Sequence, residues 1–131
     1  MQEVKAKLLK AWPYQQDKMK LPVGNVESAI PFYETHLAFH VVSRADAPFK
    51  SAILQRDDLQ VGLEENGGDP TQDGCFFEVD DLQKVFDECK TSGLTKELSD
   101  FSLQKHGDVN WKVFFVVAPD GLCYCFGQRQ S

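Results

Sequence analysis

The chain has 131 residues and a net charge of −6 at pH 7, with 42% hydrophobic and 26% charged residues. This size and composition are those of one ordinary globular domain. The acidic balance argues against nucleic-acid binding, which needs clustered basic side chains. No apolar run approaches the roughly 20 residues of a membrane span, and residues 1–12 lack the apolar core of a signal peptide. We therefore expect a cytoplasmic protein that binds neither nucleic acid nor membranes.

The first 16 residues form an N-terminal extension to a single domain at 17–131. Within it, Val4, Leu8 and Leu9 are compatible with one helical turn or with an edge strand. We expect the extension to pack against the domain or against a second subunit.

The first half of the domain begins with a strand, a turn and a helix. Apolar residues alternate with polar ones or proline at 18–23, which predicts a strand buried on one face. Asn25 is a suitable N-cap for the amphipathic helix that follows. Three more strands are predicted at 39–45, 50–56 and 59–65.

A polar, glycine-rich linker at 66–70 precedes a second unit of the same kind. A strand at 75–79 leads to a helix that is capped by Asp80 or Asp81 and stopped by Gly93. Residues 95–108 are polar and predict a loop with at most one short strand. Strands at 111–117 and 122–126 complete the unit. Strand, helix and three strands thus occur twice, at about 17–65 and 74–127.

Three motifs in this order resemble the glyoxalase/bleomycin-resistance/dioxygenase superfamily, also called the vicinal oxygen chelate superfamily. They are Val23–Asn25 with Phe32-Tyr33 and Leu37-Ala38-Phe39, then residues 77–82, then Ala118-Pro119-Asp120-Gly121 with a closing strand that ends at Phe126-Gly127-Gln128. The resemblance implies an α+β fold in which two βαβββ modules curve an eight-stranded mixed sheet around a cavity. It also implies a homodimer, as in much of the family.

Metalloenzymes of this superfamily hold a divalent cation with four ligands, typically His, Gln or Glu, on inward faces of the sheet. The resemblance places these four positions at Lys18, Glu64, Gly74 and Cys125. A protonated ammonium has no lone pair and glycine has no side chain, so one conventional ligand remains. The resemblance therefore predicts no metal and no other cofactor. If one divalent ion is bound after all, Glu64 and Cys125 are its expected ligands.

Alternation along the predicted strands places a mixture of polar and aromatic side chains on the cavity faces. Such a mixture suits a small-molecule site, and Lys18 beside Glu64 suggests an ion pair in the volume that a metal would fill. The predicted ligand-binding residues are Lys18, Lys20, Gln60, Glu64, Phe76, Glu78, Lys112, Phe114 and Cys125, and Cys123 faces the same way. The alternative is a closed core in which Phe76 and Phe114 stack.

Three functions remain open at this point. The first, which we prefer, is a metal-free protein of the bleomycin-resistance type that sequesters a small molecule without transforming it; residues 110–121 resemble the matching stretch of that branch. The second is a metal-dependent lyase, isomerase or dioxygenase with a displaced site made of Glu64, Cys123, Cys125 and a histidine. The third is a structural or interaction role with a filled cavity. All four cysteines are expected to be free thiols in a reducing compartment.

Overall fold

The structure is a computed structural model that describes residues 7–13 and 17–130. The helices are α1 (Val26–His36), α2 (Leu82–Thr91) and a short 3₁₀ helix, η1 (Pro70–Gln72). A five-stranded sheet contains β1 (Leu8–Pro13), β6 (Gly74–Val79), β7 (Ser102–His106), β8 (Val109–Val117) and β9 (Cys123–Gln130). A four-stranded sheet contains β2 (Leu21–Pro22), β3 (His40–Ala45), β4 (Ser51–Arg56) and β5 (Leu59–Glu64).

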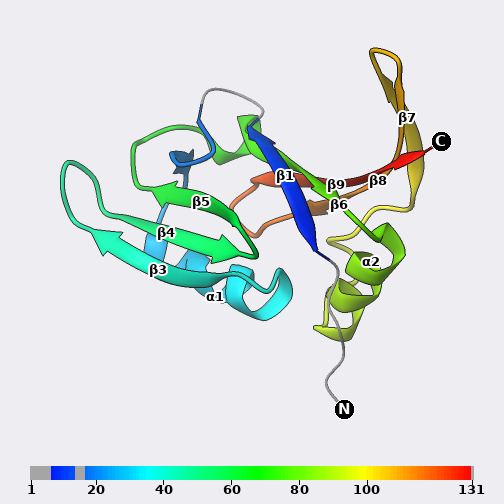
Figure 1. Cartoon of the computed structure of the whole chain (residues 1–131). Helices are drawn as coiled ribbons and strands as arrows, with labels where there is room; N and C mark the ends of the chain where they lie inside the picture. The colour runs from blue at the N-terminus through cyan, green and yellow to red at the C-terminus, as the bar shows by residue number, and fades with distance from the viewer. Residues whose placement is uncertain (1–6, 14–16, 131) are drawn as a thin grey trace.

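Two βαβββ modules follow each other along the chain, as the sequence predicts. The strands lie in the orders β2-β5-β4-β3 and β1-β6-β9-β8-β7 (Figure 1). In each module the first strand runs parallel to the last, and the remaining neighbours are antiparallel. The predicted α+β class is therefore confirmed, with the strands divided between two sheets.

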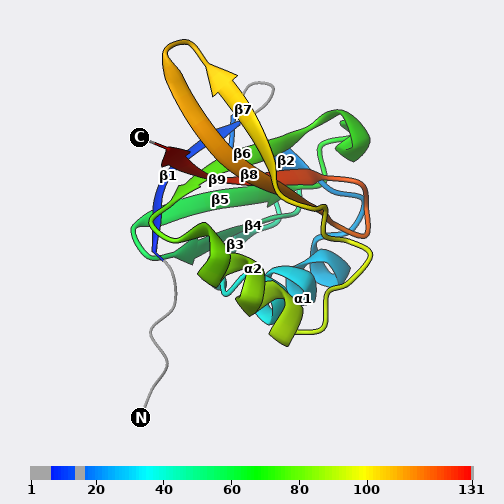
Figure 2. The ribbon, with the colours of Figure 1, turned by 90° about the vertical axis from the view of Figure 1, so that its right-hand side faces the viewer.

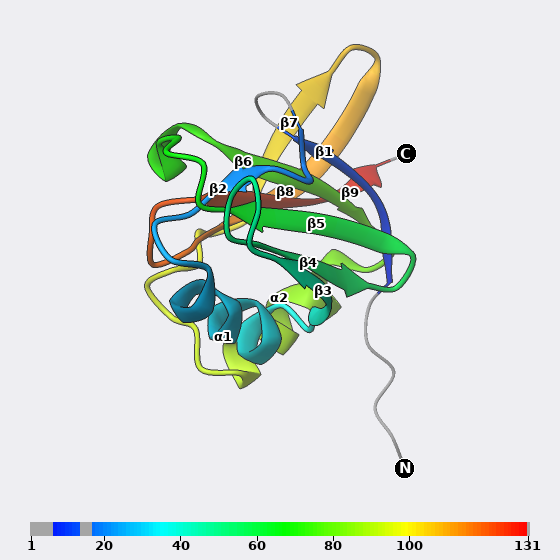
Figure 3. The ribbon, with the colours of Figure 1, turned by 90° about the vertical axis from the view of Figure 1, so that its left-hand side faces the viewer.

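The main hydrophobic core lies between the helices and the sheets and belongs to both modules. Figure 2 and Figure 3 show α1 and α2 beside each other on one side of the sheets. Ile30 of α1, Val85 of α2 and Phe77 of β6 are all buried in this core. A second, smaller cluster lies on the other face of the five-stranded sheet and contains Phe76, Trp111, Val113 and Cys125.

Both helices begin at the N-caps that the sequence predicts. The Asn25 side chain accepts the Ser28 N–H at 2.9 Å, and the Asp81 side chain accepts the Lys84 N–H at 3.1 Å. Gly93 follows α2 with φ at +112°, a conformation that favours glycine, which fits its predicted role as a stop signal. No helix in the described chain combines the length and apolar character needed to cross a membrane.

The N-terminal extension supplies an edge strand to the second module. β1 pairs antiparallel with β6, and Trp12 lies opposite Phe76. Of the two predicted alternatives for this segment, the strand is correct for residues 8–13, whereas Val4 lies outside the described residues. This part of the extension packs against its own domain.

The strand predicted at 18–23 is wrong except at Leu21–Pro22. The Asp17 side chain accepts the Met19 N–H at 2.8 Å, and the Lys20 N–H donates to the Asp17 carbonyl at 3.1 Å. These two bonds close a turn, which competes with the extended backbone that the alternation favours. The backbone of this turn lies close to β5 at Gly62, where an added Cβ would lie 2.0 Å from the Met19 carbonyl oxygen. Only glycine fits there.

The polar segment at 95–108 contains one strand, β7, in agreement with the prediction. β7 and β8 form a hairpin that turns at Gly107, whose φ is +62°. Figure 1 and Figure 2 show this hairpin projecting beyond the rest of the molecule.

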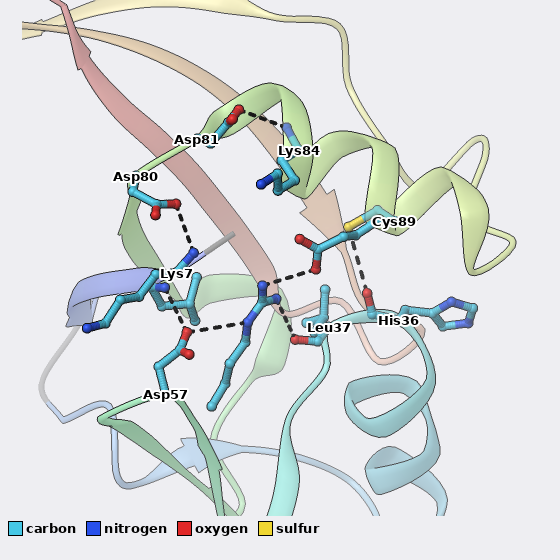
Figure 4. A network of polar contacts seen from close by, with 11 residues as sticks. Lys7, His36, Leu37, Asp57, Asp80, Asp81, Lys84 and Cys89 are labelled. Carbon is cyan, nitrogen blue, oxygen red and sulfur yellow. Dashed lines mark hydrogen bonds and ion pairs between the residues drawn. The ribbon is translucent and has the colours of Figure 1, made fainter. Parts of the chain in front are cut away.

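A polar network joins the two modules where β4 and α1 end. Arg56, only 5% exposed, donates to the Leu37 carbonyl and to the Glu88 carboxylate of α2, both at 3.0 Å. The neighbouring Asp57 accepts the Leu8 N–H of β1 at 2.9 Å (Figure 4). Because these bonds connect β1, β4, α1 and α2, the modules are held as one unit.

Candidate functional site

The candidate site is a groove on the face of the five-stranded sheet that the helices leave uncovered. Its volume is about 460 Å³. Four aromatic side chains line it, namely Trp12, Phe76, Trp111 and Phe115. The remaining lining comes from Gln104, His106, Val109, Cys125 and Arg129. We call this feature the aromatic groove.

Edge-to-face contacts hold the aromatic rings of the groove in place. The Phe76 and Trp111 rings lie 5.0 Å apart at 83°, and the Trp12 and Trp111 rings lie 6.3 Å apart at 81°. Gly127 of β9 makes the first contact possible, because an added Cβ would lie 2.6 Å from Phe76 and 3.2 Å from Trp111. The groove is therefore a preformed aromatic surface.

Arg129 and Glu78 form the charged end of the groove. The Arg129 Nε donates to Glu78 at 2.8 Å, and the guanidinium carbon lies 5.0 Å from the centre of the Trp111 ring. Glu78 is only 7% exposed, whereas half of the Arg129 side chain is exposed. Stacking on an indole and one charge-assisted bond fix the guanidinium in a single orientation.

Two further groups of the groove are buried. Burial raises the pKa of the Cys125 thiol to about 12, so the sulfur stays protonated at neutral pH and is a poor nucleophile. The indole N–H of Trp111 is buried and has no acceptor among the described residues. This donor is closed to solvent, so a molecule in the groove does not reach it without a rearrangement of the indole.

Three of the nine predicted ligand-binding residues lie on the groove side of the sheet. Phe76 and Cys125 line the groove, and Glu78 holds Arg129 at its edge. Cys123 is two residues from Cys125 on β9 and so shares its sheet face, as predicted. That Phe76, Glu78 and Cys125 bind a ligand stays a prediction.

The prediction that Lys112 and Phe114 face the cavity is wrong. Phe114 is fully buried against α2, where its ring meets Phe86 at 5.2 Å. The Lys112 ammonium lies 4.5 Å from the ring of Phe101 on the same sheet face. The residue that faces the groove instead is Phe115. A shift of one residue in a strand moves every side chain to the opposite face.

The four predicted residues of the first module lie away from the groove. Gln60 donates to Gln55 at 3.0 Å, and Glu64 accepts from Asn66 at 3.2 Å. Lys18 donates to the Gln60 carbonyl at 3.1 Å, so the expected pair with Glu64 does not form in the described structure. Lys20 borders a separate acidic pocket with Asp17, Asp69 and Asp73. The structure does not bring the nine residues to one site.

The side chains at the four family metal positions do not fit a divalent cation. The Lys18 ammonium is engaged with a carbonyl, position 74 is glycine, and the Cys125 thiol is protonated. Glu64 and Cys125, the ligands expected if a metal were bound, belong to different sheets. Within the described residues, no three His, Cys, Asp or Glu side chains are grouped to hold a metal ion.

The histidines differ in their surroundings. His36 shares a hydrogen bond of 2.8 Å with Ser92 between the two helices, and His40 is exposed at the start of β3. His106 lies in the groove, with its ring 5.7 Å from Phe76. The displaced site that needs a histidine beside Glu64 is therefore not assembled among the described residues.

The sequence pattern does not identify five important groove residues: Trp12, His106, Trp111, Phe115 and Arg129. Alternation predicts that Trp111, Val113 and Phe115 share one face of their strand, but it does not show that this face lines the groove. Trp12 carries no such signal, because its place depends on the pairing of β1 with β6.

Comparison with known proteins gives consistent results. A bleomycin resistance determinant encoded on the transposon Tn5 superposes with a TM-score of 0.71 at 28% identity, covering 89% of this chain and 99% of that one. A bleomycin-binding protein complexed with bleomycin gives a TM-score of 0.70 at 28% identity, covering 88% and 99%. A virulence protein from Salmonella typhimurium shares the fold at 18% identity, with a TM-score of 0.67 and coverage of 87% and 95%. No curated protein sequence matches significantly.

The family is shown by the sequence as well as by the fold. The family model described as Glyoxalase/Bleomycin resistance protein/Dioxygenase superfamily matches residues 15–102, well over half of the chain. The two βαβββ modules and the solved relatives agree with this match. This chain belongs to the glyoxalase/bleomycin resistance protein/dioxygenase superfamily.

Proposed function

We propose that this protein binds a small, planar aromatic molecule in the aromatic groove and sequesters it without metal chemistry. The observation that carries the proposal is the groove itself, an open aromatic surface of about 460 Å³. This volume is within the range of small-molecule sites, and such sites combine apolar walls with a few polar groups. Trp12, Phe76 and Trp111 offer rings against which a flat ligand stacks.

The comparison with the bleomycin-binding protein supports binding rather than catalysis. That protein is similar over nearly its whole length and forms a complex with bleomycin. Bleomycin is therefore the first ligand to test on this chain. The donor set at the family metal positions supports a protein that works without a cofactor, because lysine, glycine and a protonated thiol do not hold a divalent ion.

We also propose a homodimer in the cytoplasm. Several large apolar side chains outside the groove are exposed in the single chain, among them Leu103 at 78%, Val42 at 45% and Leu9 at 44%. A second copy covering them would remove this apolar area from water. No disulfide joins any of the four cysteines, all of which lie in the described part of the chain, and this suits a reducing compartment. Sedimentation equilibrium tests the dimer, and a monomer at every concentration would refute it.

Tryptophan fluorescence gives a direct test of binding. The chain has two tryptophans, and both Trp12 and Trp111 line the groove. Titration with bleomycin and with a panel of planar aromatic compounds should change the emission in a saturable way. Phe115→Ala should weaken this binding. Phe49→Ala, which removes an exposed aromatic ring outside the groove, serves as the matched control and should leave it unchanged.

Metal analysis separates this proposal from the alternative of a metal-dependent lyase, isomerase or dioxygenase. Protein purified without a chelator or a histidine tag should carry no stoichiometric divalent ion. It should also take none up when zinc, nickel, manganese or iron(II) is added. One tight ion per chain would support the enzyme instead. Absence of any fluorescence response across the whole panel would overturn the binding function.

A further inference from the structure

We infer that the aromatic groove selects ligands that carry a carboxylate next to their aromatic ring. This inference rests on the proposed function and adds the chemical class of the ligand. It depends on the state of Arg129, whose guanidinium lines the groove and lies over the Trp111 ring.

Arg129 is oriented but not saturated. Its Nε donates to Glu78 at 2.8 Å, and its plane is held over Trp111 at 5.0 Å. Its two terminal amino groups have no partner among the described residues, and half of the side chain is exposed. A guanidinium presents N–H donors in a fork that matches the two oxygens of a carboxylate. The free edge of Arg129 is therefore a ready binding edge for such a group.

Trp111 places the guanidinium beside the aromatic wall of the groove. The residue is only 4% exposed, and its ring centre lies 5.0 Å from the guanidinium carbon of Arg129. A carboxylate bound to the free edge of Arg129 therefore lies next to the rings against which the aromatic part of the ligand stacks.

The other polar groups of the groove do not offset this preference for acceptors. The Gln104 side-chain oxygen is already hydrogen-bonded to His106 at 2.9 Å, and Glu78 is bound to Arg129. A cationic ligand would have to compete with Arg129 for Glu78. A neutral ligand would leave the guanidinium edge unused. Donors thus outnumber available acceptors, which favours an anionic aromatic compound.

Calorimetric titration with three compounds of equal ring size tests the inference: 2-naphthoate, 2-naphthamide and 2-naphthylmethylammonium. The carboxylate should bind at least about tenfold more tightly than the amide, since charge-assisted hydrogen bonds are roughly twice as strong as neutral ones. This advantage should shrink as salt is added, because half of Arg129 is exposed to solvent. The ammonium compound should bind most weakly.

Two substitutions should move the preference in opposite directions. Arg129→Gln should remove the advantage of the carboxylate over the amide. Glu78→Gln is nearly isosteric and keeps an acceptor oxygen for the Arg129 Nε, but it removes the negative charge beside the guanidinium, so it should increase that advantage. Arg44→Gln is the matched control, because Arg44 pairs with Glu27 on the exposed surface outside the groove.

The outcomes distinguish the inference from the proposed function. Equal binding of carboxylate and amide, or a preference that survives Arg129→Gln, would overturn the inference and leave the aromatic binding function standing. If none of the three compounds binds and bleomycin also fails, the binding function is refuted together with the inference.

Discussion

The two faces of the five-stranded sheet are both apolar but have different neighbours. On one face Phe77, Phe114 and Phe126 stack under the helices, with Phe77–Phe126 and Phe114–Phe126 separations of 5.3 and 5.4 Å. On the other face Phe76 and Phe115 line an open groove. Phe114 and Phe115 are adjacent in the sequence, yet one is fully buried and the other remains partly exposed.

Both faces of this sheet are apolar, so the one that becomes core is the one that the helices cover. α1 and α2 close one face (Figure 2), whereas β1 contributes Trp12 beside the other and leaves a cavity. Aromatic area that is buried on folding stabilises the chain, and aromatic area left in a groove is available to a ligand. The two faces should therefore respond differently to the same substitution.

Phe114→Ala should have the largest effect on stability. The ring contacts Phe86 of α2 and stacks on Phe126, so its removal leaves a cavity in the main core. Buried Phe→Ala substitutions typically cost about 3–5 kcal/mol in the free energy of unfolding. Urea unfolding followed by circular dichroism measures this loss.

Phe115→Ala on the groove face is the matched comparison for Phe114→Ala. It should cost roughly 1 kcal/mol or less, because part of the ring is already in contact with water. Its main effect should be weaker ligand binding. Equal losses of stability for the two variants would show that the groove face is also closed in solution, and would contradict the comparison.

A loss of stability between those of Phe114→Ala and Phe115→Ala should come from the polar pair on the helix-covered face. Tyr33 of α1 and Tyr124 of β9 share a hydrogen bond between their hydroxyls, and both side chains are buried. Burial raises the pKa of both phenols well above 10, so the pair remains neutral. Each single Tyr→Phe variant leaves one buried hydroxyl without this partner, at a cost of about 1–3 kcal/mol.

The double variant Tyr33→Phe/Tyr124→Phe should cost less than the sum of the two single variants. This follows because removing both hydroxyls leaves no unpaired polar group. Unfolding free energies of the parent, the two single variants and the double variant give the coupling energy between the two hydroxyls. Additive losses would mean that the two hydroxyls do not interact.

Local patterns in the sequence were sufficient to predict the two modules and both helix N-caps. Asn25 and Asp81 act on residues within their own helices, so their role is visible without tertiary information. The face of β8 was not predictable in this way. Both phases of its sequence, Trp111-Val113-Phe115 and Lys112-Phe114-Val116, contain large apolar groups, and alternation cannot assign them.

The groove depended on contacts between distant segments. Trp12 reaches Phe76 through the pairing of β1 with β6, and Gly127 leaves room for Phe76 to meet Trp111. The turn around Met19 likewise requires Gly62 of β5. None of these relations leaves a periodic signal in one stretch of sequence, which is why sequence patterns alone do not predict most of the groove.

The smallest expected effect lies in the β8–β9 turn beside the helix-covered face. Desolvation raises the pKa of the half-buried Asp120 carboxyl above its usual 3.8, so the folded state holds this proton more tightly than the unfolded state. The resulting stability is present below the unfolded pKa and is lost as pH rises through the folded pKa. Asp120→Asn should therefore be slightly more stable than the parent at neutral pH.

Asparagine retains an oxygen that accepts the Leu122 N–H, so the turn itself is preserved. Urea midpoints at about pH 7 and about pH 4 should show the gain shrinking at the lower pH, where the parent carboxyl becomes protonated. Glu27→Gln is the control of opposite sign, because the bond from Arg44 lowers the pKa of Glu27. Removal of the Glu27 carboxylate should lower the stability at pH values above the pKa of Glu27 in the unfolded chain, and should have no such effect below the pKa of Glu27 in the folded protein. If Asp120→Asn instead increases the stability equally at both pH values, the effect comes from the conformation of the turn and not from the desolvated negative charge of Asp120.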